Sequence, residues 1–204
     1  MTLQTFSDVD LLRRMMAGEE DAFAELYKRR QAGVYRFALQ MSGSPEIAED
    51  VTQEVFMALM RTADRFDPER GSLAAYLYGI ARNYVLRRLE QDRAFIPITD
   101  SIEEGTAPGG IIAEGDPLDD LTRGETIQSL RDSILALPPH YREVIVLCEL
   151  HEMSYLEAAS VVGCAVGTVR SRLHRARGLL LERLRAARER SSVRQEVKPA
   201  RCFA

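Results

Sequence analysis

The strongest chemical signal is an arginine-rich stretch near the C-terminal end, GTVRSRLHRAR (residues 167–177). Val169, Leu173 and Ala176 recur at helical spacing, so they share a buried stripe and turn most of the polar side chains to the opposite face. Guanidinium groups bind guanine edges and phosphates in forked pairs. This stretch therefore predicts contacts with duplex DNA. The predicted contacts are Thr168, Arg170, Ser171, Arg172, His174, Arg175 and Arg177.

The elements just before this stretch are those that would position it in the major groove. Ser154 and Glu157 have the S-x-x-E spacing of a capping box, which predicts a helix start, and Gly163 ends that helix. A second helix then starts near Thr168. A helix, a short glycine-containing turn and a second helix form a helix-turn-helix, whose second helix contacts base edges. A solvated arginine-rich surface helix is the alternative, but the capped helix upstream favours DNA binding.

The remaining periodicity is also helical, and it predicts an all-α fold. Residues 7–41 form a helical pattern that Gly18 divides in two. Ser44 and Pro45 begin the next helix, whose apolar stripe includes Met60. Residues 64–71 form a loop, and Ser72 caps a helix through about Leu89. Further helices are predicted over 125–137 and 141–149.

The segment 93–122 separates two helical regions. It carries one arginine against seven carboxylates, with three prolines and four glycines, a composition that does not bury a core. We predict two small helical domains, residues 1–92 and 123–190, joined by a flexible acidic linker over 93–122, with a disordered tail over 191–204. The linker could span two DNA sites about two turns apart, on the order of 70 Å.

Composition excludes several other classes of protein. The net charge of −4 hides the basic segment 166–190, which has eight arginines and two glutamates. No apolar run reaches the length of a membrane span, and the N-terminus does not resemble a secretion signal, so a cytoplasmic protein is expected. Nucleotide-binding, hydrolase and zinc-protease motifs are missing, so we expect no enzyme and no cofactor.

The cysteines and histidines do not predict a metal site. Cys148, His151 and Cys164 lack paired ligand spacing, and Cys148 falls on an apolar helix face, where a buried structural thiol is the simpler interpretation. Cys202 is the third cysteine, so the odd number of thiols does not form a disulfide framework.

With these motifs in view, SYLEAASVVGCAVGTVRSRLHRARGLLLERL resembles the second conserved domain of extracytoplasmic-function sigma factors. DAFAELYKRRQAGVYRFALQMSGSPEIAEDVTQEVFMALMR and FDPERGSLAAYLYGIARNYVLRRL resemble the first. The likeness covers roughly residues 8–188 except the linker. It implies a non-enzymatic factor that brings RNA polymerase to promoters. Two positions depart from the common pattern: Gly79, where many relatives carry a cation, and Ala165, where many have proline.

The resemblance also implies roles for particular residues. A polar face of one helix is implied to bind the polymerase clamp, and the region 61–89 is implied to melt the proximal promoter element and capture an unstacked base. Aromatic rings beside cations suit that task. Among the aromatics, Phe66 in the loop is the better candidate for a base pocket, and Tyr84 is assigned to the core. The implied polymerase contacts are Glu49, Asp50, Gln53 and Glu54. The implied proximal-element contacts are Arg61, Arg65, Phe66, Arg70, Tyr76, Arg82, Asn83 and Arg87.

The implied partners are core RNA polymerase, through the clamp of its largest subunit and the flap of its second largest, promoter DNA, and an anti-sigma protein. No small-molecule substrate is expected. The main alternative is a stand-alone helix-turn-helix regulator. An aromatic and cationic base-capture region argues against that alternative, and an adaptor that acts only through protein contacts leaves the recognition helix unexplained.

Overall fold

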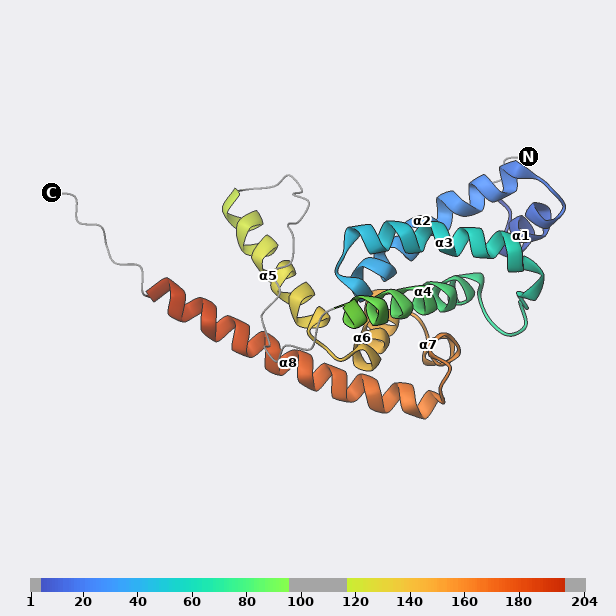
Figure 1. The fold of residues 1–204 in the computed structure, drawn as a ribbon. Helices are drawn as coiled ribbons and strands as arrows, with labels where there is room; N and C mark the ends of the chain where they lie inside the picture. The colour runs from blue at the N-terminus through green and yellow to red at the C-terminus, as the bar shows by residue number, and fades with distance from the viewer. Residues whose placement is uncertain (1–4, 96–116, 197–204) are drawn as a thin grey trace.

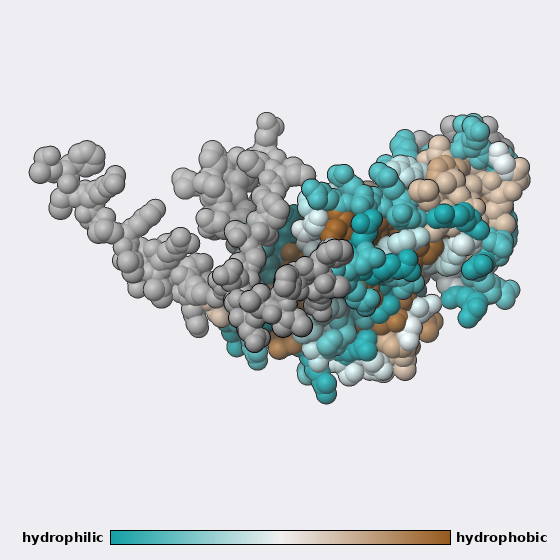
Figure 2. All heavy atoms as spheres, in the orientation of Figure 1, coloured by the Kyte–Doolittle hydropathy of each residue, from teal (hydrophilic) through white to brown (hydrophobic). Residues whose placement is uncertain are grey.

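The computed structural model describes residues 5–95 and 117–196, and these residues form helices and loops with no strand (Figure 1). The prediction of an all-α fold is confirmed. Figure 2 shows that hydrophilic residues cover most of the described surface in view, with apolar residues visible between them.

The N-terminal helices begin and end where side-chain chemistry dictates. Ser7 and Asp10 form a capping box, and the Ser44 hydroxyl accepts from the Ile47 amide with Pro45 in the first turn. Gly43 ends its helix with φ 76°, a left-handed conformation that favours glycine. The elements are α1 (Asp8–Met16), α2 (Glu20–Ser42), α3 (Pro45–Thr62), the 3₁₀ turn η2 (Ala63–Arg65) and α4 (Leu73–Phe95).

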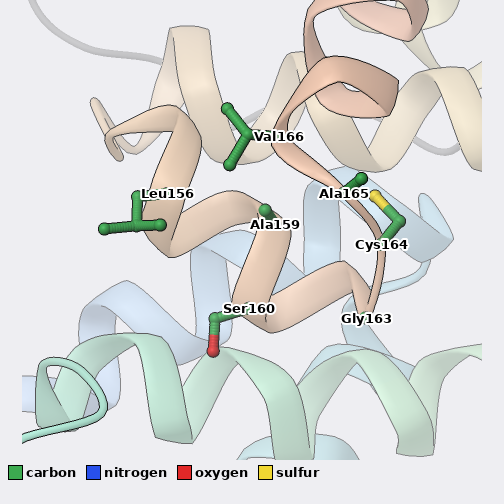
Figure 3. A pocket seen from close by; sticks show the side chains of 7 residues that line it. All are labelled: Leu156, Ala159, Ser160, Gly163, Cys164, Ala165 and Val166. Carbon is green, nitrogen blue, oxygen red and sulfur yellow. The ribbon is translucent and has the colours of Figure 1, made fainter.

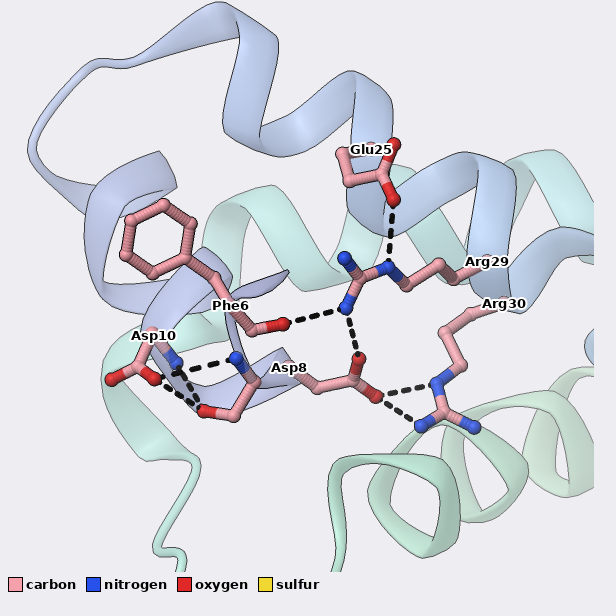
Figure 4. Close-up of polar contacts among 7 residues, drawn as sticks. Phe6, Asp8, Asp10, Glu25, Arg29 and Arg30 are labelled. Atoms are coloured by element: carbon pink, nitrogen blue, oxygen red, sulfur yellow. Dashed lines mark hydrogen bonds and ion pairs between the residues drawn. The ribbon is translucent and has the colours of Figure 1, made fainter. Parts of the chain in front are cut away.

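An ion-pair cluster anchors the chain start to α2 (Figure 4). The guanidinium of Arg29 donates to the Phe6 carbonyl at 2.7 Å and to Glu25 at 2.8 Å, and it lies 3.6 Å from the Asp8 carboxylate. Arg30 also pairs with Asp8. These contacts hold α1 against α2 while Leu11 and Leu12 are buried beneath it.

The C-terminal helices include the predicted helix-turn-helix. Ser154 and Glu157 form the predicted capping box, and Gly163 ends the helix at φ 74°. Val169, Leu173 and Ala176 are fully buried, as the periodicity predicted. The elements are α5 (Pro117–Leu135), α6 (Pro139–Ile145), the π-helical turn η3 (Val146–Leu150), α7 (Tyr155–Val162) and α8 (Val166–Glu196).

The structure differs from the sequence prediction in the bounds of the linker and the tail and in the burial of one residue of α3. The expected linker 93–122 overlaps the end of α4 and the start of α5, and its residues 96–116 lie outside the described part. Helix α8 runs through Glu196, six residues into the expected tail, and residues 197–204 also lie outside. Met60, which was expected on the buried stripe of α3, is 54% exposed.

The two groups of helices pack directly against one another. Helix α4 lies beside α7, and the C-terminal end of α2 contacts α5 and α6 (Figure 1). At Gly43 a Cβ atom would lie 2.9 Å from the Leu135 side chain, which shows how closely α2 and α5 approach. The Arg142 guanidinium donates to the carbonyls of Met41, Leu135 and Leu137, so it links the ends of α2 and α5.

Candidate nucleic-acid interface

Helix α8 presents one basic face because its other face is buried. The turn that precedes it is closed by a hydrogen bond from the Cys164 amide to the Ala159 carbonyl at 3.1 Å. On the outer face, Arg170, Ser171, His174 and Arg175 are exposed. These side chains come from the first three turns of the helix, the part that a helix-turn-helix inserts into the major groove.

Neighbouring groups steady several of the predicted DNA contacts. The Arg170 guanidinium lies 5.9 Å from the Tyr155 ring centroid. The Ser171 hydroxyl donates to the Thr168 carbonyl at 3.0 Å. Arg177 Nε donates to Glu149 at 3.1 Å, and this pair is open to solvent. Because both partners remain largely exposed, the Arg177 pair is weak enough to be exchanged for a phosphate.

Arg172 differs from the other arginines of α8. Its side chain is only 30% exposed, and its Nη1 lies 3.2 Å from Glu143 Oε1. Its guanidinium is therefore bound within the protein, and it is the least available of the predicted recognition-helix residues.

The second predicted DNA-binding region surrounds η2 and the start of α4. The Phe66 and Tyr76 ring centroids are 5.5 Å apart, and both rings are half-buried. The Tyr76 hydroxyl donates to the Thr62 carbonyl at 3.1 Å. This bond fixes the Tyr76 ring, and the Phe66 ring, on the loop, packs against it. Tyr84, which was assigned to the core, is half-buried against it.

Most of the cations predicted for this region are available to a ligand. Arg87 lies 5.9 Å over the Tyr84 ring centroid. The exposed cations are Arg61, Arg65, Arg70 and Arg87, and the neutral amide of Asn83 is exposed as well.

Arg82 is the exception in this region, as Arg172 is in α8, because Glu143 of α6 binds it. Its Nε donates to Glu143 Oε2 at 2.7 Å, and its side chain is 20% exposed. The Glu143 side chain itself is 2% exposed. One buried carboxylate thus binds an arginine from each predicted DNA-binding region. The sequence analysis missed Glu143, since nothing in its local pattern separates it from a solvated glutamate.

Two further polar contacts join the same two groups of helices. The Tyr78 hydroxyl lies 2.9 Å from His151 Nδ1, and His151 Nε2 lies 2.9 Å from the Gln40 side-chain oxygen. Burial lowers the pKa of His151 from 6.5 to about 4, with a smaller effect of the Arg36 charge. Burial also raises the pKa of Tyr78. Sequence reasoning considered His151 only as a metal ligand and missed this role.

Ser72 and Glu157 make the third contact of this kind. The Ser72 hydroxyl donates to Glu157 Oε1 at 2.9 Å, while Glu157 Oε2 caps α7 through Ser154. The hydrogen bond from Ser154 is the main cause that lowers the pKa of Glu157, and the bond from Ser72 adds to it. The N-terminal ends of α4 and α7 thus share one carboxylate.

The outer face of α3 combines polar and apolar side chains. Glu49, Asp50 and Gln53 are exposed, whereas Glu54 is half-buried. Arg88 of α4 pairs with Asp50 at 3.2 Å. Met57 and Met60 extend this face by one and two turns and are both about half exposed. The predicted polymerase contacts therefore adjoin an apolar surface that the sequence analysis did not foresee.

A shallow hollow lies in the helix-turn-helix, between α7 and the start of α8 (Figure 3). Leu156, Ala159, Cys164 and Val166 contribute to its lining, and Leu156 is 72% exposed. An exposed leucine beside a hollow is a surface suited to another protein rather than to DNA.

The described residues give little evidence for a metal site or for a reactive thiol. Within residues 5–95 and 117–196, no three metal-ligating side chains come together. Burial raises the pKa of Cys148, which keeps this half-buried thiol protonated. Across the same part of the chain, no helix is both long and apolar enough to cross a bilayer.

Known proteins share both halves of this architecture. The family description "Sigma-70 region 2" matches residues 26–95, and "Sigma-70, region 4" matches residues 127–180. SigW of Bacillus subtilis, an ECF RNA polymerase sigma factor, is 32% identical over 178 residues, which cover 85% of this chain and 95% of SigW. The ECF sigma-E factor of Escherichia coli K12 is 35% identical over 180 residues, covering 85% and 92%.

Two solved structures have a similar fold. The structure of CnrH in complex with the cytosolic domain of CnrY has a TM-score of 0.62 at 26% identity, covering 88% of this chain and 97% of that one. The sigma factor RpoE of Bartonella quintana, in complex with the anti-sigma factor NepR, has a TM-score of 0.59 at 26% identity, covering 80% and 96%.

The fold and the matched regions define this chain as a sigma factor of RNA polymerase, a transcription initiation factor. Within that class it belongs to the extracytoplasmic-function (ECF) family.

Proposed function

We propose that this chain joins core RNA polymerase and directs it to promoters with two upstream elements. The C-terminal unit, residues 123–190, reads the distal element with α8, and the N-terminal unit, residues 1–92, melts the proximal element. Residues 93–122 connect the units, and 191–204 have no assigned role. The single observation that carries the proposal is the exposed basic face of α8, set by the burial of Val169, Leu173 and Ala176 within a helix-turn-helix.

Each predicted site residue takes a part in this proposal. Arg170, Ser171, His174 and Arg175 reach base edges or phosphates first, because they are exposed on the outer face of α8. Arg172 and Arg177 join after their ion pairs with Glu143 and Glu149 are exchanged for DNA, and Thr168 lies at the start of the same helix. At the proximal element, Phe66 stacks on an unpaired base while the exposed arginines and Asn83 follow the backbone. Tyr76 holds the Phe66 ring.

The outer face of α3 is proposed to bind the clamp of the polymerase. Glu49, Asp50 and Gln53 offer acceptors to a basic partner, and Met57 and Met60 add the apolar area that a stable contact needs. The hollow beside Leu156 is proposed to receive an apolar segment of the polymerase flap. No catalysis by this chain is needed, because bond formation belongs to the polymerase.

We further propose that an anti-sigma protein controls this chain and that it works in the cytoplasm, where bacterial RNA polymerase transcribes. The likeness to RpoE, which was solved in complex with an anti-sigma factor, supports such control and extends over 80% of this chain. An anti-sigma protein that covers α3 or the hollow beside Leu156 would exclude the polymerase.

Reconstituted transcription tests the proposal. Core bacterial RNA polymerase is incubated with a promoter library, with and without the protein, and start sites are read by sequencing. New start sites that share two upstream elements are expected only with the protein. If the core enzyme stays silent while the protein binds duplex DNA, the chain is a stand-alone regulator and the proposal is wrong.

A further inference from the structure

Glu143 occupies an unusual position for a charged residue. Its carboxylate is almost fully buried and is bound on one oxygen by Arg82 of α4 and on the other by Arg172 of α8. Burying a carboxylate costs several kcal/mol unless it is paired and fully hydrogen-bonded. Here both partners are arginines that are proposed above to contact promoter DNA. The ion pairs of Glu143 with these two arginines can therefore form only while the arginines do not contact DNA.

The distance between two promoter elements also rules out DNA binding by both arginines while they are paired with Glu143. Arg82 and Arg172 are bridged by a single carboxylate, so their guanidinium groups are only a few ångströms apart. Two promoter elements about two DNA turns apart lie on the order of 70 Å from one another. The two helices cannot reach both elements while they share Glu143.

Three more contacts lie across the same boundary and support one closed state. They are His151 with Tyr78 and Gln40, Ser72 with Glu157, and Arg142 with the Met41 carbonyl. The Phe37 ring packs 5.3 Å from Tyr78 and 5.9 Å from His151. Each contact joins α2 or α4 to the segment 142–157, so they all break together if the units separate.

We infer that Glu143 is an autoinhibitory latch, which holds the two DNA-binding units closed in the free protein and releases Arg82 and Arg172 when polymerase separates the units. The inference rests on the proposed function, because it needs both arginines to contact promoter DNA. It adds a regulatory element that lies within this chain and that acts without any anti-sigma protein.

A matched pair of variants separates the latch from a simple change of charge. Glu143→Gln keeps the size of the side chain and removes its charge at the boundary. Glu149→Gln removes the same charge from the same unit and frees an arginine of α8, Arg177, but breaks no contact between the units. Circular dichroism and thermal unfolding verify that each variant folds. His151→Phe, which keeps the ring packing and leaves Glu143 in place, is a second way to loosen the boundary.

Small-angle X-ray scattering of the full-length free protein measures closure, and fluorescence anisotropy measures its affinity for promoter duplex. Glu143→Gln is expected to increase the radius of gyration and to raise affinity on the order of tenfold, as the loss of one charge-assisted hydrogen bond predicts. Glu149→Gln should leave the radius unchanged and alter affinity less than about threefold. His151→Phe should also increase the radius.

Two results overturn the latch. One is an unchanged radius in Glu143→Gln, and the other is equal affinity of Glu143→Gln and Glu149→Gln for DNA. Transcription with core polymerase is measured in parallel, and it tests the proposed function independently of the latch. If wild type and variants all fail to direct transcription, the sigma role is wrong, whereas scattering still shows whether Glu143 closes the protein.

Discussion

The Tyr78 hydroxyl and the Nδ1 of His151 lie 2.9 Å apart, although 73 residues separate them in the sequence. Since the Gln40 oxygen can only accept, the neutral imidazole carries its proton on Nε2, and its Nδ1 accepts from Tyr78. Both ring nitrogens are thus used by the opposite group of helices. A proton added to this ring must go on Nδ1, where the tyrosine hydroxyl now donates.

The contact between Tyr78 and His151 makes the packing of the two units against each other sensitive to pH. Burial holds the pKa of His151 near 4 in the closed protein, whereas an exposed histidine titrates near 6.5. Because the pKa of His151 is lowered in the closed protein, neutral His151 contributes fully to the stability of the closed state above pH 6.5. This contribution is lost as the pH falls toward 4. The other groups that face the ring are the Tyr78 hydroxyl, whose pKa is raised by burial, the neutral amide of Gln40 and the guanidinium of Arg36.

We therefore expect the radius of gyration of the free protein to increase between pH 7.5 and pH 5, as measured by small-angle scattering. His151→Phe removes the titrating group and should flatten this dependence while its packing against Phe37 remains. A pH response of equal size in this variant would show that another group is responsible.

The recognition helix gives the second prediction. Arg175 is exposed on the outer face of α8, and its truncation to alanine should lower the affinity of the holoenzyme for its promoter by about 1–3 kcal/mol, which is about fivefold to 150-fold. Binding is measured on promoters with an intact and with a scrambled distal element. The loss should appear only with the intact element.

Arg13→Ala is the matched control for Arg175→Ala. Arg13 is an exposed arginine of α1, so its removal changes the net charge equally but lies in the other unit. An equal loss of promoter affinity in both variants would mean that α8 acts only through overall charge.

Local chemistry explains which parts of the fold could be predicted from the sequence. The starts of α3 and α7 were predicted from Ser44 and Ser154, because a capping hydroxyl acts within three residues of itself. The buried stripe of α8 was likewise found from its period. The start of α5 was missed although Pro117, followed by Asp119 and Asp120, is a typical helix start.

The missed parts of the site depend on distant partners. Glu143 meets Arg82 across 61 residues and Arg172 across 29, so no window of local sequence contains the network. The same is true of His151, whose partners lie on α2 and α4. Arg82 was predicted from the sequence to contact DNA, but its ion pair with Glu143 depends on packing that only the three-dimensional structure contains.

The loop aromatic gives the third prediction. Phe66→Ala should lower open-complex formation on duplex promoters by about fivefold to 150-fold, because stacking of one base on an aromatic ring contributes about 1–3 kcal/mol. A fluorescent adenine analogue in the proximal element reports the unstacking directly. Loss of the ring should leave the initial closed complex intact, since Phe66 is not part of α8.

Tyr76→Phe controls for disturbance of the same pocket. It keeps the ring that packs against Phe66 and removes only the hydroxyl that donates to Thr62, at a cost of about 1 kcal/mol in the free energy of unfolding. Open-complex formation should change less than about threefold. If Phe66→Ala behaves like Tyr76→Phe, then Phe66 supports the loop and does not capture a base.

The fourth prediction concerns the turn that aims α8. Gly163 has φ 74°, and a Cβ atom built there meets no atom within 4 Å, so any penalty for alanine comes from the backbone alone. Gly163→Ala should destabilise the protein by about 1–2 kcal/mol, the cost of a left-handed conformation for a residue with a Cβ.

Gly178→Ala, within α8, offers the opposite case. Gly178 lies within α8 with a helical backbone and with equally open space around its Cβ position, so alanine should stabilise the protein by up to about 1 kcal/mol. Calorimetry of the full chain should therefore give melting temperatures that move in opposite directions for the two variants. A shift of the same sign in both would mean that the turn tolerates alanine by changing shape, and the angle between α7 and α8 would then no longer depend on this glycine.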